Sequence, residues 1–332
     1  MRTIYWKGDH VVLIDQTKLP AELVAVEVRS VDALIDAIVR LAVRGAPALG
    51  TAGAFGVAIA SLTADREGRS RQWVHAEATR VAEARPTAVN LSWGVRRVAP
   101  LIDAGSEAVI AEALAIAEED VVANTALGER GADLLTELCG TPMSLQTHCN
   151  TGALACVDWG TALGIVRSLH RRGHIDHVYA DETRPLLQGA RLTAWELVQM
   201  GVNHSVVVDG AGPTVIASGR VQAVVVGADR IAFNGDTANK IGTYPLALAA
   251  QRAGIPFIVA APESTLDVST KSGADIHIEM RDPDEVLMWA GVRTAPIQSS
   301  ALNFAFDVTP GDLVTAIVTE RRVIRPARGE HL

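Results

Sequence analysis

The sequence is poor in cysteine, since only three cysteines, at positions 139, 149 and 156, occur in 332 residues. An odd number at these spacings matches neither a disulfide framework nor a Cys-x-x-Cys metal site. The first seven residues also lack the apolar core and the small-residue cleavage site of a signal peptide. These absences favour a reducing compartment, and we expect the protein in the cytoplasm.

Clusters of basic residues are missing as well, because Lys and Arg come at most in short pairs such as Arg171-Arg172 and the formal net charge is -8. Such a chain offers no electrostatic footprint for nucleic acid or anionic lipid. The longest weakly polar stretch, residues 46–60, is short for a membrane span and rich in Gly and Ala. Nucleotide-binding fingerprints of the Gly-x-x-x-x-Gly-Lys and Gly-x-Gly-x-x-Gly types are absent from the sequence. We therefore expect small-molecule chemistry without a nucleotide cofactor, a nucleic-acid partner or a membrane.

What is present is a well-cored chain, 48% hydrophobic and 20% charged, of about two domains. Residues 3–28 alternate around turn signals and predict a small antiparallel β cap. Helical periodicity follows at residues 31–43, 71–83, 91–101 and 106–136, with Ser30 as an expected helix cap. This pattern predicts an N-terminal β cap and helical domain over residues 1–135.

The second half of the sequence alternates short β-branched runs with helical segments. The runs lie at residues 144–148, 177–180, 204–208, 223–226 and 257–260. This alternation is typical of parallel strands linked by helices. The sequence therefore predicts an α/β fold with a Rossmann-like parallel sheet flanked by helices over residues 136–332.

Polar loops follow these strands, and two of them carry a thiol and an acid. Cys149 comes after the first strand, before a helix expected to open at Ala153, and a helix N-terminus would lower the pKa of a thiol from about 8.5. Asp229 comes after the apolar run 221–226. Because ligands bind at the carboxyl ends of parallel strands, both residues are candidate catalytic groups. Cys149 alone also fits a small buried hydrophobe, and His148 a structural hydrogen-bonding role. Asp229 also fits a cap of the next segment or a partner of Arg230.

Two further segments suit a phosphorylated ligand. Arg44-Gly45-Ala46-Pro47 starts a Gly/Ala-rich helix, whose first amides would be free and positively polarised beside a guanidinium. Asn239 and Lys240, in a segment that begins ten residues beyond Asp229, offer an amide and an ammonium on the same side of the sheet. The alternative is that Arg44 and Lys240 are ordinary surface cations.

Ordered sequence blocks across residues 43–320 resemble the methylthioribose-1-phosphate isomerase family, which is related to the initiation factor 2B regulatory subunits and to ribose-1,5-bisphosphate isomerases. The blocks are Val43-Arg44-Gly45-Ala46-Pro47-Ala48, residues 85–91, Thr147-His148-Cys149-Asn150-Thr151-Gly152, residues 182–193, Gly227-Ala228-Asp229-Arg230-Ile231, residues 234–243, Ala305-Phe306-Asp307-Val308-Thr309-Pro310 and Thr319-Glu320.

The resemblance implies an aldose–ketose isomerisation of 5-methylthioribose 1-phosphate to 5-methylthioribulose 1-phosphate in methionine salvage, without metal or other cofactor. It implies that Asp229 donates a proton to open the sugar ring and that Cys149 assists hydrogen transfer from carbon 2 to carbon 1. An acid that donates near neutral pH needs a pKa above about 3.9, which burial after an apolar strand would supply. The implied substrate-binding residues are Arg44, Gly45, Ala46, Arg85, Gln188, Asn239 and Lys240.

The sequence departs from the family pattern at residues 210–214, where Gly-Ala-Gly-Pro-Thr replaces a Ser-Met-Ala-type loop. That change leaves another 5-substituted substrate open, such as 5-deoxyribose 1-phosphate or ribose 1,5-bisphosphate. A non-catalytic, ligand-sensing regulatory subunit is the alternative of a different class, but it has no need of both Cys149 and Asp229. By the same resemblance we expect a homodimer, the commonest oligomer.

Overall fold

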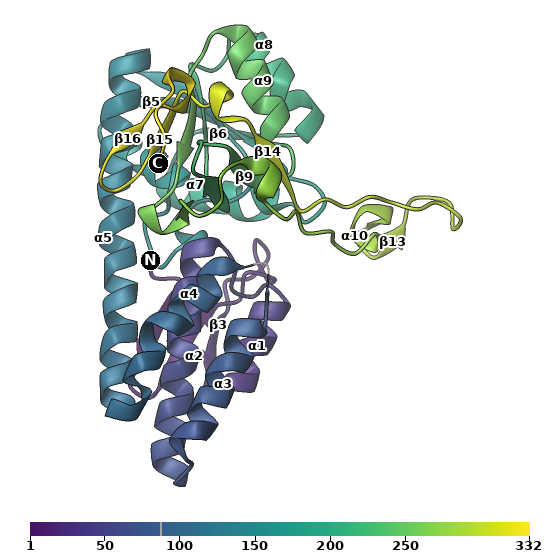
Figure 1. Cartoon of the computed structure of the whole chain (residues 1–332). Coiled ribbons are helices and arrows are strands. Elements are labelled where there is room, and N and C mark those ends of the chain that lie inside the picture. The colour runs from purple at the N-terminus through teal and green to yellow at the C-terminus, as the bar shows by residue number, and fades with distance from the viewer. Residues whose placement is uncertain (87) are drawn as a thin grey trace. The chain divides into compact units, whose positions relative to one another are not determined.

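The computed structural model describes residues 1–86 and 88–332 and divides the chain into two compact units. Unit 1 comprises Met1–Ala126 and Thr151–Gly164, and unit 2 comprises Leu127–Asn150 and Ile165–Leu332. Helix α5 (Ser106–Cys139) is continuous, beginning in unit 1 and ending in unit 2 (Figure 1). The domain boundary suggested by the sequence, between residues 135 and 136, therefore lies inside α5.

Unit 1 begins with the small antiparallel sheet that the sequence predicts. Its strands, in the order β1-β2-β3, are β1 (Ile4–Lys7), β2 (His10–Ile14) and β3 (Ala25–Val28). Lys7 pairs with His10, so Gly8 and Asp9 form the turn, and Gly8 adopts a φ of 64° that glycine takes without strain. The β cap is confirmed.

The helices of unit 1 follow the predicted periodicity closely. They are α1 (Val31–Val39), α2 (Ala46–Glu67), α3 (Arg71–Glu83), α4 (Val89–Val98), the 3₁₀ turn η1 (Ala99–Ala104) and the first part of α5. The Ser30 side chain accepts a hydrogen bond from the Ala33 amide and caps α1, as predicted. α1 ends at Val39 rather than at residue 43, and Leu41 then takes a left-handed φ of 63°, which stops the helix from continuing.

Helix α2 lies in the core of unit 1, where small residues let α4 approach it closely. A Cβ atom at Gly94 would lie 1.9 Å from the carbonyl oxygen of Gly50, and one at Gly53 would lie 2.4 Å from that of Leu91. By length and composition α2 could cross a membrane, but 78% of its most apolar 18-residue window is buried inside the protein. The Gly and Ala residues of α2 thus serve helix packing in a core.

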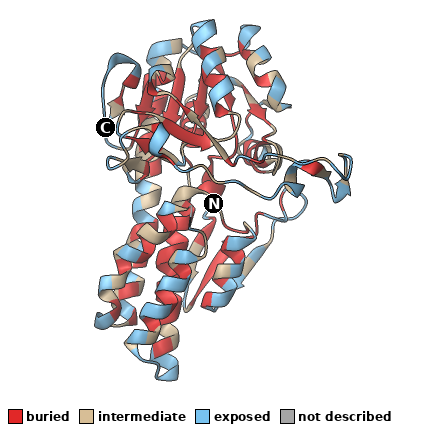
Figure 2. Ribbon diagram, turned by 45° about the vertical axis from the view of Figure 1, so that its right-hand side comes forward, coloured by how far each residue is buried: buried red, intermediate tan, exposed pale blue. Residues whose placement is uncertain are grey.

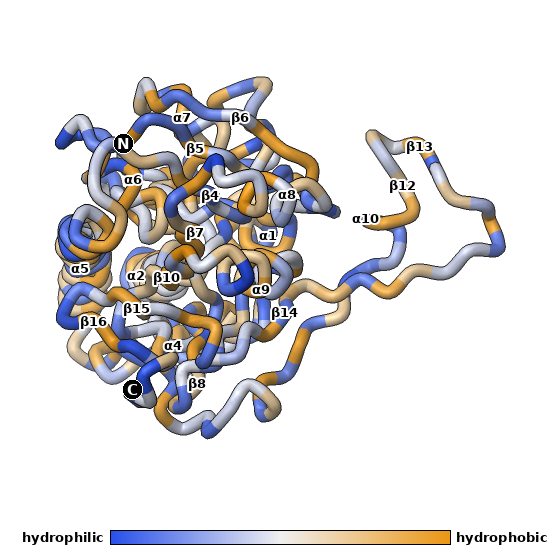
Figure 3. Tube along the Cα trace, turned by 90° about the horizontal axis from the view of Figure 1, so that it is seen from above, coloured by the Kyte–Doolittle hydropathy of each residue, from blue (hydrophilic) through white to orange (hydrophobic). Residues whose placement is uncertain are grey.

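Unit 2 is built on a sheet in which seven strands are described. In sheet order they are β16 (Val323–Ile324), β15 (Ala316–Val318), β10 (Phe257–Ala260), β7 (Ala223–Val226), β4 (Met143–Thr147), β5 (Ile175–Asp181) and β6 (His204–Val207). All neighbours pair in parallel except β15 and β16. Seen from above, the strands follow one another in this order (Figure 3), and most of the sheet is buried (Figure 2). The five strands predicted from the sequence are confirmed as a parallel sheet.

Helices connect these strands, and a smaller sheet stands beside the large one. The helices are α6 (Ala162–Arg171), the π-helical turn η3 (Gly189–Thr193) with α7 (Ala194–Met200), α8 (Gly212–Ala217) and α9 (Thr243–Ala253). The smaller sheet has the order β11 (Leu266–Asp267), β8 (Arg230–Ala232), β9 (Thr237–Lys240) and β14 (Phe306–Thr309).

An extended arm between β11 and β14 reaches away from the rest of unit 2 in two views (Figures 1 and 3). It carries α10 (Asp284–Leu287) and the hairpin of β12 (Met288–Trp289) with β13 (Val292–Arg293). The sequence patterns did not indicate this arm, because its elements are only two to four residues long.

Candidate functional site

The order of the strands creates a switch point in the middle of the large sheet. The chain builds β4, β5 and β6 outward in one direction, returns to β7 on the other side of β4, and then continues to β10 and β15. Ligands of open α/β sheets bind at the carboxyl ends of the strands where the order reverses. Cys149 follows β4 and Asp229 follows β7, so the two predicted catalytic residues come after the two strands that flank this point.

Cys149 is held firmly in place by hydrogen bonds of its backbone. Its amide donates to Oγ1 of Thr183 over 2.9 Å, and its carbonyl accepts from Oγ1 of Thr193 over 2.6 Å. The residue is buried, with 7% of its surface exposed, and adopts a left-handed φ of 61°. Few residues other than glycine take this conformation, so the surrounding contacts fix the position of the thiol.

The prediction of a helix that begins at Ala153 is wrong. Only a short 3₁₀ turn, Ala153–Ala155, forms there, and α6 begins at Ala162. The backbone closes on itself instead, because Gly152 bridges to Gly160 and the Thr161 amide donates to the Thr151 carbonyl over 2.8 Å. There is therefore no α-helix N-terminus at Ala153 that could lower the pKa of the Cys149 thiol.

The loop after β5, residues 182–188, is shaped by Asp209. The Asp209 carboxylate accepts from the amides of Thr183, over 2.7 Å, and Arg184, over 2.6 Å. Thr183 also has a left-handed φ, of 67°. At the end of the loop, Gln188 is buried, and its Oε1 has no hydrogen-bond partner among the described residues. A buried acceptor or donor left unpaired in this way suits a ligand, as predicted for Gln188.

Asp229, directly before β8, lies opposite β9, which carries Asn239 and Lys240. The Asp229 amide donates to the Ala238 carbonyl over 2.9 Å, and Arg230 pairs with Ala238, so the register puts Asp229 opposite Asn239. The Lys240 ammonium donates to the carbonyl of Ala305 over 2.8 Å and lies 4.5 Å from the centre of the Phe306 ring. It is thus an anchored cation with a defined position rather than a loose surface one.

The expected burial of Asp229 is wrong, because its side chain is exposed in unit 2. The apolar strand β7 ends at Val226, and the chain leaves the sheet over the next two residues. Burial by the strand therefore does not reach this carboxyl group.

In unit 1, Arg44, Gly45 and Ala46 lie together at the start of α2. Gly45 is the N-cap with a φ of 93° and offers no side-chain cap, while Arg44 Nε donates to Oε1 of Gln16 over 3.1 Å. A Cβ atom at Gly45 would lie 2.4 Å from the Ala155 carbonyl oxygen, so glycine is required at this close approach. The predicted helix start beside Arg44 is thus confirmed, without a side-chain cap, and its use as an anion site stays a prediction.

Arg85, the remaining predicted binding residue, follows the end of α3 in unit 1 and is half-buried. Its neighbour in the predicted motif, Thr87, lies outside the described residues. The predicted binding residues thus divide into a unit 1 group and a unit 2 group.

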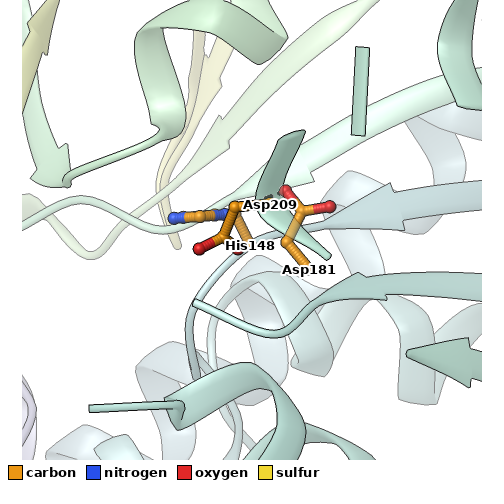
Figure 4. A group of neighbouring side chains, drawn as sticks. All are labelled: His148, Asp181 and Asp209. Atoms are coloured by element: carbon orange, nitrogen blue, oxygen red, sulfur yellow. Dashed lines mark hydrogen bonds and ion pairs between the residues drawn. The ribbon is translucent and has the colours of Figure 1, made fainter. Parts of the chain in front are cut away.

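A cluster that was not among the candidates lies next to Cys149. His148, Asp181 and Asp209 place ligand atoms within 4.8 Å of one another (Figure 4). His148 Nδ1 is 2.9 Å from Asp181 Oδ2, and Nε2 is 2.8 Å from the Ile241 carbonyl oxygen, which confirms the structural role predicted for His148. Although such a set could hold a metal, both ring nitrogens and both Asp209 oxygens already bind protein groups. The sequence does carry a signal for this cluster. Asp181 ends β5 and Asp209 follows β6, so both acids stand at the end of a strand as Asp229 does.

The segment 210–214 is not a loop as expected, because the 3₁₀ turn η4 (Asp209–Ala211) runs directly into α8. A Cβ atom at Gly212 would lie 2.7 Å from Gln146 Nε2 and 3.0 Å from Asp181 Oδ1. The departure from the family pattern therefore packs directly against the buried polar cluster.

Comparisons with known proteins identify the family of the chain. A model of the Initiation factor 2 subunit family matches residues 42–326. A methylthioribose-1-phosphate isomerase of Xanthomonas euvesicatoria pv. vesicatoria is 49% identical, covering 98% of this chain and 92% of that protein. The crystal structure of a 5-methylthioribose 1-phosphate isomerase from Pyrococcus horikoshii OT3 is 42% identical with a TM-score of 0.89, covering 98% of this chain and 92% of that one. The chain belongs to the initiation factor 2 subunit family, and within it to the methylthioribose-1-phosphate isomerases.

Other relatives within these families carry different names. A bifunctional methylthioribose-1-phosphate isomerase/methylthioribulose-1-phosphate dehydratase of Nocardia farcinica is 52% identical over 97% of this chain, which spans 59% of that protein's length. A 5-deoxyribose 1-phosphate isomerase of Moorella thermoacetica is 49% identical over 97% of this chain and 94% of that protein. The crystal structure of translation initiation factor eIF-2B, subunit delta, from A. fulgidus is 43% identical with a TM-score of 0.88, covering 99% of this chain and 97% of that one.

Proposed function

We propose that this chain is an aldose–ketose isomerase that converts 5-methylthioribose 1-phosphate to 5-methylthioribulose 1-phosphate in methionine salvage. Near-full-length relatives named for this isomerase support the reaction. The observation that carries the proposal is the pair of reactive groups, Cys149 and Asp229, after the two strands that flank the switch point of the sheet. A binding subunit would need neither group there.

In this proposal the substrate enters as a closed ring, with its anomeric oxygen blocked by phosphate. Asp229 protonates the ring oxygen once the bound substrate excludes water from its exposed carboxyl group and so raises its pKa. Cys149 assists the transfer of hydrogen from carbon 2 to carbon 1. Positioned acid–base groups of this kind contribute about 10² to 10⁴ in rate. Neither a metal nor a nucleotide takes part in this chemistry.

The proposed binding groups supply the charges that a sugar phosphate requires. Arg44 with the first amides of α2, at Gly45 and Ala46, and the anchored Lys240 are cationic or positively polarised. Arg85 adds a second guanidinium, and Asn239 and Gln188 offer amides for hydroxyl groups. We propose that the protein acts as a homodimer in the cytoplasm, and light scattering will decide between the mass of one chain and that of two.

A second candidate substrate is 5-deoxyribose 1-phosphate, because a relative named for that isomerase is as similar as those named for methylthioribose 1-phosphate. Ribose 1,5-bisphosphate is a third, and it would place a second phosphate where the other substrates have an apolar substituent. A Cβ atom at Gly212 would lie 3.0 Å from Asp181 Oδ1, so the segment in which this chain differs from the family pattern bears on the choice.

The deciding experiment follows ketose formation by NMR with a panel of ribose 1-phosphates that differ only at carbon 5, without added metal or nucleotide. We expect kcat/KM to be highest for the 5-methylthio compound. A preference for the 5-deoxy compound or the bisphosphate would reassign the substrate and keep the isomerisation. Absence of turnover with every compound would contradict the proposal and favour the regulatory-subunit alternative.

A further inference from the structure

His148 joins three loops that carry proposed site residues. It lies between β4 and Cys149, and its Nδ1 contacts Asp181 at the end of β5, where the loop leading to Gln188 begins. Its Nε2 contacts the Ile241 carbonyl, directly after Asn239 and Lys240 on β9. One fully buried ring therefore ties together the segments that position the thiol, one amide and the ammonium.

The turn after β9 is fitted closely around this ring. A Cβ atom at Gly242 would lie 2.7 Å from Cε1 of His148, so the backbone of Gly242, with a φ of 103°, packs directly against the imidazole. Oδ2 of Asp307 accepts from the Gly242 amide over 2.8 Å and from the Tyr244 amide over 3.1 Å. Asp307 also pairs with Asn239 between β14 and β9. A displacement of the ring would thus move the turn that presents Asn239 and Lys240.

The hydrogen-bond partners constrain the charge of the ring. The Ile241 carbonyl can only accept, so Nε2 must carry a proton. The ring is an imidazolium when Nδ1 also carries a proton and donates it to the Asp181 carboxylate. Burial disfavours a charged ring, but the hydrogen bond to Asp181 and the charges of Asp181 and Asp209 outweigh it, so the pKa of His148 is raised.

Three acids act on the ring. They are Asp181 on β5, Asp209 after β6 and Asp307 on β14. Burial raises the pKa of Asp181, while its hydrogen bond to His148 opposes that rise. Loss of the Nδ1 proton would place a lone pair against the Asp181 carboxylate, and loss of the Nε2 proton would place one against the Ile241 carbonyl. In either case one of the two hydrogen bonds of the ring would break.

We propose that His148, as a doubly protonated imidazolium clamped between Asp181 and the Ile241 carbonyl, is a positioning residue that holds Cys149 and the Asn239–Lys240 turn in the geometry needed for isomerisation. This inference rests on the proposed function. In this proposal His148 touches neither the substrate nor the reacting atoms. Turnover nevertheless depends on the positive charge of its buried ring.

The first test compares His148→Gln with His177→Gln in the full-length chain. Glutamine can replace only one of the two donors of His148, so we expect kcat to fall about 10²-fold, because displacement of about 1 Å at a site costs this much. His177 lies on β5, where its Nε2 contacts Ser205 Oγ over 2.9 Å, and is the matched control, for which we expect wild-type kcat. Wild-type kcat in a folded His148→Gln protein would overturn the proposal.

A second variant gives a readout that a purely structural role would not move. Asp181→Asn keeps an acceptor for Nδ1 but removes the neighbouring charge, so the pKa of His148 should fall. We expect the alkaline limb of the kcat–pH profile to move to lower pH by about 1 to 3 units. An unmoved alkaline limb would overturn the proposal even if His148→Gln fails to fold.

The charge itself can be observed without turnover, by ¹⁵N NMR of the imidazole in the wild-type protein. We expect two protonated ring nitrogens on His148 at pH 7. A neutral ring, protonated on Nε2 alone beside a protonated Asp181, would overturn the proposal. Wild-type turnover with the substrate panel tests the proposed function separately, because the ratio of variant to wild type reports only on His148.

Discussion

Cys149 and Thr183 both adopt a left-handed backbone, with φ angles of 61° and 67°, and they hydrogen-bond to each other. Such conformations cost of order 1–3 kcal/mol each in residues other than glycine and persist where the surroundings impose them. The imposing groups are visible here, since Asp209 binds the Thr183 amide and Thr193 binds the Cys149 carbonyl. The strain lies at the two loops that carry the proposed thiol and the amide of Gln188, which fits a site prepared for a ligand.

Substitution of the two proposed catalytic residues should separate chemistry from binding. We expect Cys149→Ala and Asp229→Asn each to lower kcat about 10² to 10⁴-fold with little change in KM, because both groups act mainly in the transition state. Steady-state kinetics with the preferred substrate measures this. Cys139→Ala is the matched control, since its thiol contacts only the Gln222 carbonyl, at 3.6 Å, among the described contacts. Near wild-type kcat in either catalytic variant would remove that residue from the mechanism.

The sequence predicts which residues are candidates for the site better than it predicts what surrounds them in the fold. Cys149 and Asp229 stand out because each follows a recognisable strand. The clamp on His148 could not be found in this way, since its two partners, Asp181 and Ile241, are 33 and 93 residues away. The burial predicted for Asp229 failed for the same reason, because exposure depends on how the chain turns after the strand.

At the level of elements, the strongest local patterns gave the most accurate predictions. The predicted bounds of α3, β7 and β10 agree with the structure, since each combines clear periodicity or β-branched residues with turn signals. The helix expected after Cys149 failed, because the contact between Gly152 and Gly160 folds that segment into a loop. No local pattern encodes such a contact, and apolar residues alone do not decide between a helix and a buried loop.

The close contact of α2 and α4 makes a prediction about unit 1. We expect Gly94→Ala to lower Tm by about 4 to 12 °C, because its Cβ atom would lie 1.9 Å from a backbone oxygen of α2 and force the helices apart. Gly210→Ala is the matched control, because nothing lies within 4 Å of its added Cβ atom. Calorimetry of both variants measures the difference, and equal Tm values would contradict the close packing of these helices.

Across the whole molecule, buried ionisable groups set opposite trends of stability with pH. Although Asp236 is partly buried, the amides of Gly273 and Gly311 keep its pKa low, so its stabilisation is present above pH 4 and is lost as the pH falls further. The raised pKa of His148 acts in the other sense, because its stabilisation is complete below about pH 6.5 and is lost as the pH rises through its folded-state value. We therefore expect the free energy of unfolding to be greatest on the acidic side of neutrality.

Asp120 in α5 allows this trend to be tested with one substitution. Burial raises its pKa to about 7, against hydrogen bonds from the Val157 amide and from Asn124. The folded protein thus retains a proton that the unfolded chain releases above about pH 3.8, and stability should fall between pH 4 and 7 by up to about 1.4 kcal/mol per pH unit from this group.

Asp120→Asn should abolish that contribution, because the amide cannot ionise, and its Nδ2 can donate to Oδ1 of Asn124, which is buried without a partner among the described residues. Urea unfolding of the variant and of the wild type at pH 5, 6, 7 and 8 measures the slopes. We expect the variant to gain stability relative to the wild type as the pH rises, even if the lost acceptor makes it less stable at pH 5. Parallel curves for the two proteins would mean that Asp120 is ionised in the folded state throughout this range, and that the pH dependence arises from other groups such as His148.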